Sequence, residues 1–331
     1  MDLEALLLGE RPHLTRVQVA ERAGVPLALA EQLWRMLGFP RAADDDVAFT
    51  EADVLALRQA RELIELGIIG PDSQAALVRT WGRSFARLAE WQADLLAEVD
   101  PDEETAAAVL PRVQRLQAYA WRRHLANAAA RTLDGADGAD GASAPLAVAF
   151  VDIVGYTSRA KRLDQTQLVA WLEGFEAAAT EIVVEHGGRI IKTIGDEVLF
   201  VADEPQSAAE AVLLMTELED PFPQVRGGIA YGDVVSRLGD VFGATVNIAA
   251  RLTSLARPGT VLVDRGCHAA LAELAAYRLK SVPRASVKGY ARLQPHVLRR
   301  AARPPGETPP EGGQKQRARP LPTGDTTTTE R

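Results

Sequence analysis

Two aspartates stand where predicted β-strands end, and together they could hold a metal ion. Asp152 follows the apolar strand "LAVAFV" (146–151), and Asp196 lies in the turn of a predicted hairpin between "RIIKTI" and "EVLFVA". In a sheet built from these strands, the first strand lies beside the hairpin. We therefore expect the carboxylates of Asp152 and Asp196 to converge at one edge of the sheet. Converging carboxylates repel each other unless a cation lies between them, and Mg²⁺ is commonly held by one or two carboxylates together with substrate phosphates. The alternative is that Asp152 caps the next helix and Asp196 is an ordinary turn residue.

A second group of residues is suited to phosphate chemistry. Asn247 and Arg251 are four residues apart in a predicted helix and therefore share a face. An arginine can clamp the charge on a transferring phosphoryl group. In "IVGYT", where a strand passes into a helix, backbone N–H groups are available to phosphate and Gly155 permits close approach. The alternative for the pair is a surface arginine and an asparagine near a helix start.

Lys192 and Asp240 form a third candidate set, for reading the edge of a purine. A carboxylate accepts a hydrogen bond from the adenine amino group, and an ammonium donates one to a ring nitrogen. Lys192 lies in the first strand of the hairpin and Asp240 in the loop "LGDVFG". The alternative is a lysine on an exposed strand face and an ordinary loop aspartate.

The elements that must position these residues have an α+β pattern. After the strand at 146–151 we predict helices, a hairpin and further strands in the order β-α-β-β-α-β. This order is that of a ferredoxin-like sheet with helices on one face. The predicted helices are 165–186, 206–219 and 245–256, and the predicted strands after the hairpin are 225–235 and 260–263.

The chain before this region has a different pattern. Residues 1–131 show apolar residues at three- and four-residue spacing, which predicts a helical domain throughout. Two short helices joined at Gly24-Val25-Pro26 are similar to a helix-turn-helix. The Gly-, Ala- and Asp-rich stretch within 132–145 predicts a flexible linker before a domain at 146–298, and the Pro- and Thr-rich residues 299–331 predict a disordered tail.

Composition argues against several classes of protein, namely nucleic-acid-binding, disulfide-rich, secreted and membrane-spanning ones. The net charge is −8 over 331 residues, which disfavours nucleic acid as a partner. One cysteine, Cys267, excludes an internal disulfide framework and indicates a reducing compartment. The N-terminus lacks a basic region followed by a long apolar run, and no apolar stretch approaches the roughly 18 residues of a membrane span. We therefore expect a soluble, cytoplasmic protein.

Taken together, five segments resemble the catalytic domain of class III nucleotidyl cyclases. They are "FVDIVGYTSRA", "GGRIIKTIGDEVLF", "VRGGIAYGDVV", "FGATVNIAARLT" and "PGTVLV", which agree with that family in order and spacing over about 146–298. The resemblance implies an adenylate cyclase that converts ATP to 3′,5′-cyclic AMP and pyrophosphate. It also implies two Mg²⁺ or Mn²⁺ ions per active site and catalysis at the interface of a homodimer.

The resemblance also assigns roles to single residues. It implies a metal site at Asp152, Ile153 and Asp196, and adenine selection by Lys192 and Asp240. Asn247 and Arg251 look like the pair that orients the ribose and stabilises the transition state. Arg226 and Lys288 are similar to the residues that contact the triphosphate, and Gly155 adds backbone contacts to it.

The N-terminal region is similar to the regulatory domain of mycobacterial-type, pH-responsive adenylate cyclases. His13 and His124 are the histidines there that could titrate near neutrality. A lipid or other apolar ligand is a further possibility for the regulating signal. The competing function is a catalytically weak, cyclase-like dimerisation domain that serves a DNA- or ligand-binding regulator.

Overall fold

A computed structural model describes residues 3–67, 71–133, 143–219, 222–287 and 290–301. Of the predicted linker 132–145, residues 134–142 lie outside this description, whereas the last three belong to a strand. Most of the predicted tail, 302–331, also lies outside it, as does Lys288. No helix in the described ranges is both long enough and apolar enough to cross a membrane.

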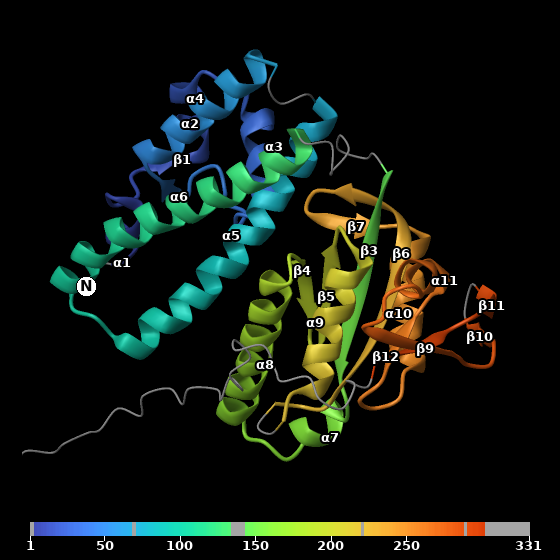
Figure 1. Ribbon diagram of the computed structural model, residues 1–331. Coiled ribbons are helices and arrows are strands. Elements are labelled where there is room, and N and C mark those ends of the chain that lie inside the picture. Colours follow the sequence, from blue (N-terminus) through green and yellow to red (C-terminus); the bar gives the residue numbers. More distant parts are fainter. Residues whose placement is uncertain (1–2, 68–70, 134–142, 220–221, 288–289, 302–331) are drawn as a thin grey trace, which may run out of the picture.

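The N-terminal region is largely helical, with two short strands that the sequence did not predict (Figure 1). Its elements are α1 (Leu3–Leu8), β1 (Leu14–Thr15), α2 (Arg16–Ala23), α3 (Leu27–Leu37), β2 (Val47–Phe49), α4 (Glu51–Glu65), α5 (Pro71–Val99) and α6 (Glu103–Leu133). The prediction of helix throughout is therefore wrong at β1 and β2, which pair antiparallel. Strands of two and three residues are too short to show the alternation that identifies a strand.

The predicted pair of short helices is confirmed as α2 and α3. Thr15 and Gln18 form a reciprocal capping box at the start of α2, and Gly24, with φ of 67°, ends it. Apolar side chains of both helices enter one core with Val54 and Leu57 of α4. The short turn between the helices is thus fixed by packing on a third helix.

The second region is built on one mixed sheet, in the order β4-β5-β3-β6-β8-β12-β9, with β7 paired to β6. Its central elements are β3 (Ser143–Ile153), α8 (Gln165–Glu185), β4 (Arg189–Ile194), β5 (Glu197–Ala202), α9 (Pro205–Glu217) and β6 (Val225–Arg237). The remaining ones are α7 (Tyr156–Ala160), β7 (Asp240–Phe242), α10 (Ala244–Leu255), β8 (Val261–Val263), α11 (Arg265–Leu271), β9 (Tyr277–Ser281), β10 (Ala285–Val287), β11 (Tyr290–Leu293) and β12 (His296–Arg300). The predicted β-α-β-β-α-β core is confirmed.

Helices cover both faces of this sheet, so the prediction of helices on one face only is wrong. Alternate residues of β3 point to opposite sides. Ala147, Ala149 and Val151 enter a core with α8, α9 and α11. Leu146, Val148 and Phe150 enter a second core with α10.

Two adjacent glycines of β6 let helices approach closely on the two faces. A Cβ on Gly227 would lie 2.4 Å from Cγ1 of Val212 in α9. A Cβ on Gly228 would lie 2.3 Å from the backbone nitrogen of Thr253 and 2.5 Å from the carbonyl oxygen of Ala249, both in α10. The glycines therefore set the distance of both helices from the sheet.

Substituting Gly228 tests this packing. We expect Gly228→Ala to lower the free energy of unfolding by about 1–3 kcal/mol, because the backbone of α10 must move to admit the methyl group. Gly174→Ala is the matched control, since its Cβ meets nothing within 4 Å and alanine favours the helix by about 0.5–1 kcal/mol. Urea unfolding measures both. Equal stability of the two variants would contradict the close packing of α10.

Candidate active site

Three carboxylates gather where β3 ends. Asp152 is paired in register with Glu197, the first residue of β5, and Asp196 lies in the turn just before it. The N–H of Ile153 donates to the carbonyl oxygen of Asp196 at 3.1 Å, which ties the end of β3 to this turn. The predicted convergence of Asp152 and Asp196 is therefore seen in the structure, and Asp152 does not serve as a helix cap.

Arg226 is the positive charge beside this cluster. It stands opposite Asp152 across the β3–β6 ladder, and its Nε and Nη2 lie 2.7 and 2.5 Å from Oδ2 of Asp152. Burial raises the pKa of Asp196, and the neighbouring Asp152 carboxylate raises it further. Burial, Asp152 and Asp196 together raise the pKa of Glu197 to about 7. The single positive charge of Arg226 therefore does not balance the three carboxyl groups when all of them are ionised.

The donor set fits Mg²⁺ or Mn²⁺. Oxygen ligands from one or two carboxylates, completed by water and substrate phosphates, are what Mg²⁺ takes in proteins. Asp152 and Asp196 supply such oxygens, and the Asp152 carboxylate helps to raise the pKa of Asp196, a repulsion that a bound cation would relieve. The backbone of Ile153 adjoins both. Among the described residues, no three or more His, Cys, Asp or Glu side chains form a group that could hold a metal by themselves.

The turn that follows β3 has the predicted strand-to-helix geometry. Gly155 adopts a φ of 74°, and a Cβ added to it would meet no atom within 4 Å, so its side is open. The N–H groups of Ser158 and Arg159 both donate to the Gly155 carbonyl oxygen at 3.1 Å, which closes α7. A hollow beside this turn is lined by Gly155, Ser158, Arg159, Arg162 and Leu163.

Lys192 and Asp240 meet within one chain, although 48 residues separate them. Nζ of Lys192 lies 2.5 Å from Oδ2 of Asp240, which joins β4 to β7. Oδ1 of Asp240 accepts from the N–H of Val241 at 2.9 Å, so the carboxylate is held from two sides. Both side chains remain partly exposed, at 40 % and 32 %, so a ligand can reach them.

Asn247 and Arg251 lie on α10, as predicted. Two hydroxyl groups anchor this helix to the sheet: Thr245 Oγ1 donates to the Asp233 carbonyl at 2.8 Å, and Thr253 Oγ1 donates to the Phe150 carbonyl at 3.2 Å. Asn247 is exposed and Arg251 half-buried. Neither side chain forms a hydrogen bond or ion pair with another described residue, so both are available to a ligand.

The predicted residues thus form separate groups in a single chain. Asp152, Asp196 and Arg226 lie together at the end of β3, and Lys192 lies with Asp240. Within the described ranges, no hydrogen bond or ion pair joins one group to the other.

Glu197 is a charged neighbour of the site that the sequence does not single out. Its residue type and place suggest only the polar start of a strand. Its position opposite Asp152 depends on the β3–β5 register, which residue types alone do not reveal.

Comparison with known proteins decides the family. The model of the adenylate and guanylate cyclase catalytic domain matches residues 141–300. The chain is 40 % identical over 277 residues to an adenylate cyclase of Streptomyces coelicolor, an alignment that covers 79 % of this chain and 72 % of that protein. The chain belongs to the class III adenylate cyclases. It is also 38 % identical over 326 residues to an adenylate cyclase of Glutamicibacter nicotianae, with 89 % of this chain and 81 % of that one covered.

The likeness extends beyond the catalytic part of the cyclase. A pH-sensitive adenylate cyclase of Mycobacterium tuberculosis is 31 % identical over 282 residues, with 79 % of this chain and 70 % of that protein covered. Because the catalytic match is confined to 141–300, an alignment of this length includes part of the N-terminal helical region.

Cation binding by the aspartates can be tested without turnover. We expect Mn²⁺ to raise the melting temperature of the cyclase by several degrees, because the ion relieves repulsion among the carboxylates. Asp152→Ala and Asp196→Ala should each lose most of this shift. Asp203→Ala, an exposed aspartate beyond the end of β5, is the control and should keep it. An undiminished shift in both site variants, measured by differential scanning fluorimetry, would contradict the assignment.

Proposed function

We propose that this adenylate cyclase converts ATP to 3′,5′-cyclic AMP and pyrophosphate with two Mg²⁺ or Mn²⁺ ions, at a site shared by two chains. The proposal rests on one observation: two sets of residues stay separate within a single chain. One set is the carboxylate cluster, whose mutual repulsion favours cation binding, and the other is the Lys192–Asp240 ion pair. Each group is suited to a different end of ATP. When two chains pack head to tail, the carboxylate cluster of one chain can lie next to the Lys192–Asp240 pair of the other.

Lys192 and Asp240 are proposed to select adenine. The ion pair holds the two side chains at a fixed spacing, and both are accessible. The carboxylate accepts from the exocyclic amino group and the ammonium donates to a ring nitrogen. A guanine would place a carbonyl oxygen against the carboxylate, and sites built on hydrogen bonds reject such mismatches because their polar groups stay unpaired.

In the proposed reaction the ribose 3′-oxygen attacks the α-phosphorus. The O3′–P bond forms, the bond from the α-phosphorus to the bridging oxygen breaks, and pyrophosphate leaves as the 3′-hydroxyl proton is released. When bound, the cations supply charge neutralisation and lower the pKa of the attacking hydroxyl. Arg251 meets the charge that develops on the α-phosphate, and Asn247, one turn earlier, orients the ribose. Arg226 and Lys288 are assigned to the triphosphate, together with the backbone at Gly155.

The shared site predicts complementation between two inactive variants. Asp152→Ala homodimers lack a metal carboxylate and Arg251→Ala homodimers lack the transition-state cation, so we expect each to lose at least about 100-fold in cyclic AMP formation. In a mixed dimer one site collects both substitutions while the other keeps every group. Activity should then recover to a sizeable fraction of wild type.

The measurement is cyclic AMP formed from ATP with Mn²⁺ after the two variants are mixed. Mixing Asp152→Ala with Asp196→Ala is the control, because both changes fall in the same carboxylate group and no complete site results. Recovery in neither mixture, with heterodimers demonstrated, would refute the shared site.

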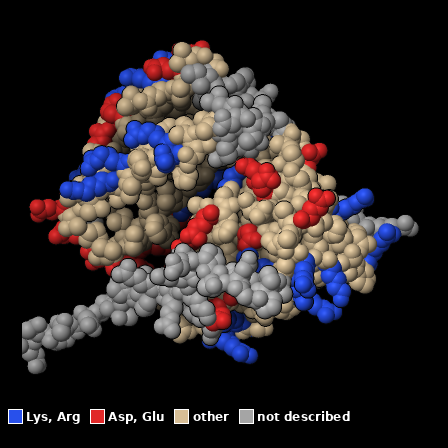
Figure 2. Space-filling view, viewed as in Figure 1, with Lys and Arg blue, Asp and Glu red and all other residues tan. Residues whose placement is uncertain are grey.

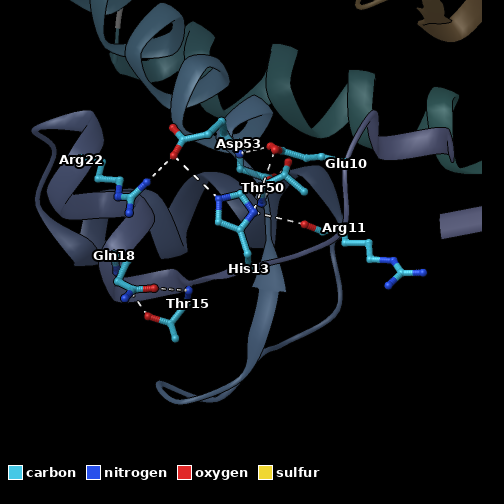
Figure 3. A network of polar contacts seen from close by, with 9 residues as sticks. Glu10, Arg11, His13, Thr15, Gln18, Arg22, Thr50 and Asp53 are labelled. Carbon is cyan, nitrogen blue, oxygen red and sulfur yellow. Dashed lines mark hydrogen bonds and ion pairs between the residues drawn. The ribbon is translucent and has the colours of Figure 1, made fainter. Parts of the chain in front are cut away.

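The N-terminal region is proposed to regulate the cyclase, and His13 is its better-placed titratable group (Figure 3). Its Nδ1 lies 3.1 Å from the Arg11 carbonyl and 4.0 Å from a Glu10 oxygen, and its Nε2 lies 3.9 Å from a Glu51 oxygen. Protonation would add ion pairs to both glutamates. His124 is exposed on α6, and no carboxylate in the described part of the chain pairs with it.

Protonation of His13 would strengthen the junction between the segment before α2 and the start of α4. We therefore expect cyclic AMP formation by the wild-type chain to depend on pH. His13→Gln should flatten this profile and His124→Gln should not. A profile that survives in His13→Gln, measured as cyclic AMP formation by the full chain, would remove His13 from the mechanism.

A further inference from the structure

A hollow in the N-terminal region lies between the start of α2, the end of α3 with the segment after it, and β2. Its volume is about 110 Å³, and three of the side chains that line it are aromatic: Trp34, Phe39 and Phe49. The rings of Trp34 and Phe49 lie against each other, with centroids 4.8 Å apart and planes inclined by 33°. Phe39 is 52 % exposed although it lines the hollow, so the space is open to solvent on its side. The hollow therefore offers aromatic surface to a molecule that arrives from solution.

The size of the hollow limits what it can hold. A cavity of roughly 150 Å³ lined by apolar side chains accepts one benzene molecule. A volume of about 110 Å³ that opens to solvent therefore suits one aromatic ring whose substituent stays outside. Such a ring can stack on the aromatic side chains with an offset or meet them edge to face. The long acyl chain of a lipid is too large for this space.

Three arginines line the same hollow, and only one of them is paired. Arg16 is held by two carboxylates: its Nη1 lies 2.8 Å from Oε1 of Glu31, and its Nε lies 2.6 Å from Oδ1 of Asp44. Arg35 and Arg41 are exposed, and neither side chain forms a hydrogen bond or ion pair with another described residue. Three arginines against two carboxylates leave one positive charge unbalanced. A ligand with one negative charge would neutralise it.

The kind of charge favours a small carboxylate over a polyanion. The planar guanidinium group donates two parallel hydrogen bonds to a carboxylate, a geometry that the two groups share. A polyanion such as DNA is bound through many phosphates and needs a broad positive surface. In the space-filling view, blue and red side chains are interspersed over the N-terminal region, so this side of the molecule shows no such surface (Figure 2).

We propose that this hollow binds a small aromatic monocarboxylate, which acts as a regulatory ligand of the cyclase. The ring of the ligand lies against Trp34 and Phe49, and its carboxylate accepts hydrogen bonds from Arg35 and Arg41. The inference goes beyond the proposed function, because the ligand is neither the nucleotide nor a cation and the site lies in the N-terminal region.

The end of α3 connects this site to the long helix α5. A Cβ added to Gly82 of α5 would lie 2.4 Å from the carbonyl oxygen of Leu37 and 2.8 Å from its Cα, so the two backbones touch. Arg35 and Phe39 stand two residues before and two residues after Leu37. A ligand that holds both of them restrains the end of α3, and α5 must follow any shift of α3 or lose this contact.

Titration of the full chain with phenylacetate, followed by ligand-observed NMR without nucleotide, tests the site. We expect Arg35→Gln/Arg41→Gln to raise the dissociation constant at least about tenfold, because the carboxylate loses both charged donors. Ala42→Phe places a ring at the hollow and should weaken binding as much. Arg87→Gln, which changes an exposed arginine of α5 away from the hollow, is the matched control and should bind as wild type does. Circular dichroism checks that every variant keeps its helix content.

Three further ligands separate the parts of the site. Acetate lacks the ring, 2-phenylethanol lacks the charge, and octanoate carries a flexible chain in place of the ring, so each should bind at least about tenfold more weakly than phenylacetate. No binding of phenylacetate below about 10 mM, equal binding by the arginine variant, or octanoate binding as tight as that of phenylacetate would overturn the proposal.

The regulatory role is read from cyclic AMP formation at saturating phenylacetate. We expect the rate of the wild-type chain to change at least about twofold and that of Arg35→Gln/Arg41→Gln to stay the same. A wild-type rate that phenylacetate leaves unchanged would refute the regulatory role. Because binding is measured without nucleotide, the site is tested independently of the proposed function.

Discussion

Repulsion among carboxylates at the end of β3 is the constraint on which the active site depends. Backbone register, not side-chain preference, sets Asp152 opposite Glu197 on one side and opposite Arg226 on the other. Because β3 lies between β5 and β6, the acidic groups have little freedom to separate. Arg226 offsets part of the charge, which lets the site form in the bare chain. Burial, followed by the charges of Asp152 and Asp196, raises the pKa of Glu197, so the cluster disfavours its full negative charge unless a cation binds.

Strand β6 connects this cluster to the other groups. Arg226 is the second residue of β6, and the next two, Gly227 and Gly228, let α9 and α10 approach the sheet. The strand ends at the turn that leads to Asp240. One continuous strand therefore fixes the carboxylate cluster, the helix that carries Asn247 and Arg251, and the residue that holds Lys192. A shift of β6 by one residue would exchange the faces of its side chains and lose all three relations at once.

Much of this arrangement could be predicted from the sequence, for identifiable reasons. The order of strands and helices follows from apolar runs separated by turn residues, and the approach of Asp152 to Asp196 follows from that order. The covering of both faces by helices does not, because a helical pattern shows which residues are buried and not against which face. The sequence does contain one sign that helices cover both faces, the adjacent glycines Gly227 and Gly228. Neighbouring strand residues face opposite sides of the sheet, and each of these glycines leaves room for a helix on its own side. Contact between residues as distant as Lys192 and Asp240 could be expected from the family resemblance alone.

A dimer with a single two-fold axis must satisfy every contact between its chains at once. If two chains share the active site, that axis relates the two catalytic sheets, and the groups of one chain face those of the other only in certain positions of the sheets relative to the helical regions. A change in the helical region that favours another position lowers the fraction of complete sites without altering any catalytic residue. A difference of about 1.4 kcal/mol between two such positions changes their ratio tenfold. Burying or exposing one apolar side chain is worth at least about that much. A local packing change in the helical region is therefore energetically sufficient to shift the balance, provided that the two positions differ in the contacts around α2 and α4.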